Sequence, residues 1–77
     1  MYTAINNYIK HQYELAVLFA DTHNDVWDYF RSAFGAVDFF LWLDESEGID
    51  GEMRGKLSHH WQDYWYPKFW ELMREKA

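Results

Sequence analysis

Hydrophobic residues recur along this chain every three or four positions, which is the spacing of one face of an α-helix. No stretch of useful length alternates hydrophobic and polar residues as a β-strand does. The pattern therefore predicts a small all-α domain, with three helices over about residues 4–20, 23–46 and 51–75. At 77 residues the chain is expected to form a single domain.

Each predicted helix carries one apolar stripe that we expect to form the core. In the first helix the stripe comprises Ile5, Tyr8, Ile9, Leu15, Ala16, Phe19 and Ala20. In the second it comprises Val26, Phe30, Ala33, Phe34, Val37, Phe40 and Leu41. In the third it comprises Met53, Leu57, Trp61, Tyr64, Trp65, Phe69 and Leu72. Because the second stripe keeps its phase across Gly35, the helix is predicted to continue through that glycine.

Residues with helix-capping chemistry flank these stripes. Thr3 is the expected N-cap of the first helix, and Thr22 with Asp25 has the spacing of a capping box at the second. Gly48 is the expected C-terminal stop of the second helix, and Asp50 the N-cap of the third.

The only proline, Pro67, lies inside the third helical pattern. Proline has no N–H to donate and its ring clashes with the carbonyl four residues earlier, which here belongs to Asp63. We therefore expect the third helix to be kinked or broken near Tyr64–Pro67. A short fourth helix that begins at Pro67 is the alternative.

Seventeen residues are Trp, Tyr or Phe, which is more than three short helices need for a core. On the second helix, Phe39 and Trp42 lie off the core stripe, beside Asp38 and Gly35. A second off-core row on the third helix consists of His59, Asp63, Tyr66 and Trp70, with Met73 close by. Because aromatic residues dominate binding hot spots, both rows are candidate partner-binding sites. The alternative is that these side chains close over the ends of the core.

The net charge of −6 is concentrated in the middle of the chain. Residues 21–52 hold nine acids against Arg31 alone, a balance of −8, and Asp44, Glu45 and Glu47 fall in this segment. Such a segment repels nucleic acid and attracts a protein partner with a basic surface. Two alternatives remain: mimicry of nucleic acid, and acids that only keep an aromatic-rich protein in solution.

Other chemistry is weakly represented. His59 and Asp63 have the i, i+4 spacing of two metal ligands, but a third ligand at readable spacing is lacking. No catalytic or cofactor-binding motif stands out, so we predict neither an enzyme nor a resident cofactor. The apolar stretch 39–43 is far too short to cross a membrane. The absence of cysteine favours a cytoplasmic location.

In composition and size the chain resembles the small acidic proteins with which phages and mobile elements block host enzymes or defence complexes. That resemblance implies a non-catalytic inhibitor that occludes a basic functional surface of a larger intracellular complex. The leading alternative is a homo-oligomeric structural or regulatory subunit, a homodimer in its simplest form, that buries its surplus aromatic residues in its own copies. A small metal-binding or catalytic helical domain is the third interpretation.

Overall fold

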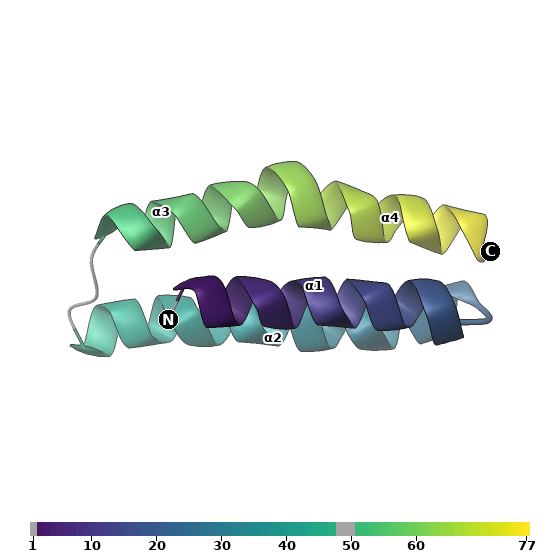
Figure 1. The fold of residues 1–77 in the computed structure, drawn as a ribbon, viewed down its shortest axis with the longest axis horizontal. Coiled ribbons are helices and arrows are strands. Elements are labelled where there is room, and N and C mark those ends of the chain that lie inside the picture. Colours follow the sequence, from purple (N-terminus) through teal and green to yellow (C-terminus); the bar gives the residue numbers. More distant parts are fainter. Residues whose placement is uncertain (1, 48–50) are drawn as a thin grey trace.

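A computed structural model describes residues 2–47 and 51–77, and the side chains of residues 3–42 and 51–77. Three helical rods lie side by side in a molecule of about 40 × 17 × 16 Å (Figure 1). The first two rods are α1 (Tyr2–Phe19) and α2 (His23–Glu47). The third consists of α3 (Gly51–His60), the π-helical turn η1 (Trp61–Trp65) and α4 (Tyr66–Glu75). No strand occurs in the described part of the chain, and the predicted all-α fold is confirmed.

The turn between α1 and α2 carries the predicted capping box. The Asp25 N–H donates to the Thr22 hydroxyl at 3.3 Å, and the Asp25 carboxylate accepts from the Thr22 N–H at 3.2 Å. The same carboxylate accepts from the Asp21 N–H at 3.1 Å, so it satisfies two backbone donors ahead of the helix. At its N-terminal end, α1 begins at Tyr2, and Thr3 lies inside the first turn of the helix. The predicted N-cap role of Thr3 is therefore wrong, because helical backbone extends past it.

The expected stops Gly48 and Asp50 lie outside the described residues. Gly35 lies within α2 as predicted, and the helix is continuous through it.

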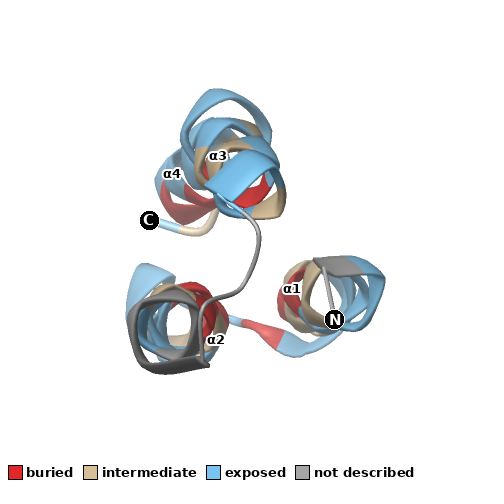
Figure 2. Ribbon diagram, turned by 90° about the vertical axis from the view of Figure 1, so that its left-hand side faces the viewer, coloured by how far each residue is buried: buried red, intermediate tan, exposed pale blue. Residues whose placement is uncertain are grey.

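Viewed end-on, the three rods occupy the corners of a triangle, with their buried residues facing its centre (Figure 2). The fully enclosed side chains include Ile9 of α1, Val26 and Phe40 of α2, and Leu57 and Phe69 of the third rod. Phe30 packs against rings from both α2 and the third rod, with ring centroids 5.1–6.3 Å apart. Burial of these apolar side chains is the main force that holds the rods together, because each rod is amphipathic.

The third rod bulges one turn before Pro67, at the place where a kink was predicted. The Tyr66 N–H donates to the Trp61 carbonyl five residues earlier, which is a π-type hydrogen bond. Pro67 occupies the first turn of α4, where the missing N–H costs least.

The wide turn also sets which residues of the third rod face inward. Leu57, Trp61, Trp65 and Phe69 are four residues apart, and in a regular α-helix each step would rotate them by about 40° away from the core. A turn with more residues reverses part of this drift, so all four are buried. Two assignments that assumed regular α geometry are therefore wrong: Tyr64 is exposed, and Met73 is buried.

The first two rods bury narrower stripes than the pattern predicted. Tyr8, Phe19 and Phe34 were assigned to the core, but each is more than two-fifths exposed. The reason is angular: Tyr8 is about 100° from Ile9 around α1, and Phe34 is about 80° from Val26 around α2. With only two neighbours, each helix buries the centre of its stripe and leaves the margins in solvent.

Polar contacts tie the third rod to α1. The Trp65 indole N–H donates to the Asn6 Oδ1 at 3.1 Å, and the Lys76 ammonium donates to the Val17 carbonyl at 3.3 Å. Lys68 lies over the rings of Tyr13 and Tyr64, with its Nζ at 5.4 and 4.6 Å from the ring centroids. Its hydrogen bond with Tyr64 raises the pKa of Lys68.

Candidate protein-binding surfaces

The four predicted aromatic anchors are all exposed in the structure. Phe39 and Trp42 are each 56% exposed, and their rings stack with centroids 5.8 Å apart. Tyr66 and Trp70 are 41% and 38% exposed, with centroids 6.1 Å apart. All four rings keep part of their surface in solvent, and Tyr66 also covers the core rings of Phe30 and Trp61.

The two pairs lie on different surfaces, because they flank α2 on opposite sides. Tyr66 borders a groove between α2 and the third rod. Phe39 borders a groove between α1 and α2. We call the first the aromatic groove and the second, with its surroundings on α1 and α2, the hairpin face.

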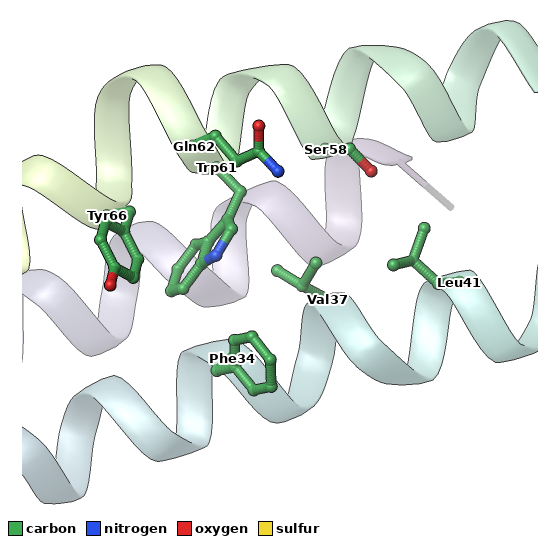
Figure 3. A pocket seen from close by; sticks show the side chains of 7 residues that line it. All are labelled: Phe34, Val37, Leu41, Ser58, Trp61, Gln62 and Tyr66. Carbon is green, nitrogen blue, oxygen red and sulfur yellow. The ribbon is translucent and has the colours of Figure 1, made fainter.

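The aromatic groove has a volume of about 500 Å³ (Figure 3). Three of its lining residues come from α2 and four from the third rod. They are Phe34, Val37 and Leu41 on one wall, and Ser58, Trp61, Gln62 and Tyr66 on the other. The Trp61 indole extends from the third rod toward α2 and forms the middle of the groove (Figure 3). The lining is mostly apolar, with Ser58 and Gln62 as its polar groups.

A chain of ring contacts extends the aromatic groove along the seam between α2 and α4. Tyr66 contacts Trp61 at 6.3 Å and Trp70 at 6.1 Å. Trp70 in turn meets Trp27 edge-to-face at 5.4 Å. These contacts hold the exposed rings in fixed orientations, and edge-to-face pairs contribute about 0.5–1.5 kcal/mol beyond the area they bury.

Phe34 is the residue of this site that the sequence pattern missed. It is 49% exposed and stacks on Phe30 with centroids 6.3 Å apart. The signal was present, because Phe34 falls at the margin of the α2 stripe rather than at its centre. A narrower stripe would have placed it on the surface, beside the third rod.

Of the three α2 acids whose side chains the structure describes, two have intramolecular partners. Asp25 is engaged in the capping box, and Asp28 forms an ion pair with Arg31. Asp38 is exposed, and no ion pair or hydrogen bond involves its side chain in the described part of the chain. The side chains of the other predicted acids, Asp44, Glu45 and Glu47, lie outside the described residues.

His59 and Asp63 line a shallow depression on the third rod, together with His60 and Lys56. Among the described residues, no group of three or more His, Asp or Glu side chains is placed to hold a metal ion. His60 instead stacks on Tyr64, with ring centroids 4.9 Å apart. Glu52 also lines the depression, but the four potential ligands there are not arranged so that three of them could bind one ion.

The hairpin face consists of two parallel rows of side chains, one on each helix. On α1 the row is Ala4, Tyr8, Leu15 and Phe19, and on α2 it is Ser32, Gly35, Phe39 and Trp42. Between the rows runs a groove of about 380 Å³ that Tyr8 and Phe39 border. Its lining includes the small residues Ala4, Ser32, Gly35 and Ala36, and a Cβ added at Gly35 would meet no atom within 4 Å. No backbone among the described residues approaches this glycine closely.

No family model, curated protein or solved structure matches this chain. None of the helices among the described residues has the length and hydropathy needed to cross a membrane. The aromatic groove and the hairpin face are thus the features from which a function can be inferred.

Proposed function

We propose that the protein is a non-catalytic binding module whose aromatic groove binds the surface of a larger intracellular protein. By analogy with small phage and mobile-element proteins, it would act as an inhibitor that occludes a basic functional surface in the cytoplasm. The observation that carries the proposal is the exposed, mostly apolar groove between α2 and the third rod, beside the most acidic helix of the chain.

The size and lining of the aromatic groove suit apolar side chains of a protein partner. Its volume of about 500 Å³ lies within the range of binding clefts, about 300–1,000 Å³. Two helices with aromatic residues between them can accept large side chains of a partner helix or loop. The exposed parts of Phe34, Tyr66 and Trp70 would then be removed from water, at about 25 cal/mol for each Å² covered.

The rings at the aromatic groove are ordered before any partner arrives. Tyr66 contacts Phe30, Trp61 and Trp70, and two of these are core residues. Ordering a flexible side chain on binding costs about 0.5–1.5 kcal/mol, and a ring already fixed avoids most of that cost. This pre-organisation favours a dedicated binding surface over an accidental exposure.

The negative charge of α2 favours a partner with a positively charged surface. The helix holds six acids and one base, Arg31, which gives a balance of −5. Acids at the rim of an interface speed encounter with a basic surface, and among the described acids of α2 Asp38 is the one without an intramolecular partner. Direct binding of nucleic acid is disfavoured for the same reason.

The test is affinity capture with matched variants of the groove. Wild-type protein is immobilised and exposed to lysate of a candidate host, and the retained proteins are identified by mass spectrometry. Tyr66→Ala removes one wall of the groove, and Ser58→Tyr fills it without removing an aromatic contact. Leu18→Ala is the control, because Leu18 is the most exposed large apolar residue among the described side chains and lines neither groove.

We expect the same partner on wild type and Leu18→Ala, and its loss from both groove variants. Circular dichroism of each variant establishes that the helices are intact. Equal retention by all four proteins, or no specific retention by wild type, would contradict the proposal.

A further inference from the structure

We propose that the hairpin face binds a second copy of this chain, so that the protein is a symmetric dimer with its two aromatic grooves free. This inference does not depend on the proposed function, because the hairpin face and the aromatic groove lie on opposite flanks of α2. It rests on the shape, the extent and the charge of the hairpin face.

The shape of the hairpin face is complementary to itself. A two-fold interface requires a projection and a recess on the same patch, since each copy offers both to the other. The stacked pair Phe39 and Trp42 forms the projection, with more than half of each side chain exposed. The recess is the adjacent groove of about 380 Å³, which Phe39 borders and whose lining includes Ala4, Gly35 and Ala36. Small residues at this position let the helices of the second copy approach closely.

The extent of the hairpin face matches the lower end of stable interfaces. Tyr8, Phe19, Phe39 and Trp42 are between 44% and 65% exposed. At about 200 Å² for each aromatic side chain, they expose about 450 Å² together. Two copies would bury about 900 Å² from these rings alone, and Leu15 with the small residues raises this toward 1,200 Å². Crystal-like accidental contacts bury less than about 800 Å².

The charge pattern favours a second copy over an unrelated partner on this face. The eight residues of the two rows are uncharged; on the same side of α2, Asp28 is paired with Arg31, and Asp38 lies beside Phe39 and Trp42. Two molecules with a net charge of −6 repel each other, so they can associate most readily where neither contributes an acid to the contact.

Dimerisation would give the proposed binding module two aromatic grooves. When a target offers two sites at the matching distance, the second contact becomes intramolecular and the overall affinity rises by about 10²–10⁴. A repetitive or symmetric target would therefore be held more tightly than a monomeric one.

The test is sedimentation of the pure protein over a range of concentrations, with a pair of glycine substitutions. Gly35→Gln places a long polar side chain in the recess, and the monomer accommodates it because the position opens to solvent within a regular helix. Gly55→Gln is the matched control, since an added Cβ there also meets nothing within 4 Å and Gly55 lies on the third rod. Trp42→Ala removes the projection.

We expect a reversible wild-type dimer, with Gly35→Gln and Trp42→Ala each weakening dimerisation at least tenfold. Gly55→Gln should sediment as wild type does. A wild-type protein that stays monomeric up to about 0.5 mM would overturn the proposal, because such an affinity is too weak for a specific interface. A dimer that is insensitive to Gly35→Gln and Trp42→Ala would also overturn it, because the contact would then lie elsewhere.

Discussion

At the scale of single residues, buried and half-exposed aromatic rings should contribute different amounts to the free energy of unfolding. Phe40 is completely enclosed, whereas Phe34 has about half of its surface in solvent. Replacing Phe40 by Ala should lower the free energy of unfolding by about 3–5 kcal/mol, through lost burial and a cavity. The same change at Phe34 should cost only about 1–2 kcal/mol, because less area is lost. Urea denaturation measures both values, and equal costs would show that Phe34 belongs to the core.

The hydrogen bond from the Trp65 indole to Asn6 links η1 to α1. Asn6→Ala leaves the indole N–H of a buried tryptophan without its partner, which should cost about 1–2 kcal/mol of unfolding free energy. In a double-mutant cycle with Trp65→Phe, the coupling should be about 1 kcal/mol. A coupling near zero would mean that the bond contributes nothing to stability.

At the scale of helices, the features that depend on local sequence could be predicted from the sequence. Local pattern and capping chemistry, both of which can be read from the sequence, predict three features correctly. These are the three helices, the capping box at Thr22 and the continuous helix through Gly35. The exposed pair Phe39 and Trp42 follows from the same pattern, because both lie far from the centre of the α2 stripe.

The remaining parts of the site depend on tertiary geometry. Tyr64 is exposed and Met73 is buried, the reverse of the prediction, because the π-turn rotates the residues that follow it around the helix axis. Pro67 indicates where the turn lies, but it does not indicate the size of this rotation. The aromatic groove was missed as a unit because its walls come from residues far apart in the sequence, such as Phe34 and Trp61. A helical wheel describes one helix and holds no information on which flank a neighbour covers.

A prediction at this scale concerns helix α2. Gly35 has helical backbone and free space at its Cβ position, so Gly35→Ala should raise the free energy of unfolding by up to about 1 kcal/mol. Gly55→Ala in α3 should have an effect of the same sign. Thermal or urea unfolding measures both, under conditions that keep the protein in one association state. A loss of stability at Gly35 would show that another backbone approaches the glycine, against the geometry described.

At the scale of the whole molecule, charge and apolar surface should control different steps of binding. Asp38→Lys should slow association with the partner and weaken its dependence on salt, because rim charges act over about 8–10 Å at physiological ionic strength. Reversal of Asp44, Glu45 and Glu47 together should slow association several-fold. Glu14→Lys is the matched control for Asp38→Lys, since it changes the net charge equally but lies on α1. If all these variants associate at the wild-type rate, the acids only maintain solubility.

The most direct test of the central claim is the dissociation rate of the captured partner from wild type and from Trp70→Ala. A buried aromatic anchor is typically worth about 2 kcal/mol or more, which corresponds to about thirtyfold. Surface plasmon resonance should therefore show dissociation at least thirtyfold faster for Trp70→Ala, with little change in association. Leu18→Ala should dissociate as wild type does. Dissociation of Trp70→Ala at the wild-type rate would contradict the claim that the aromatic groove is the binding surface.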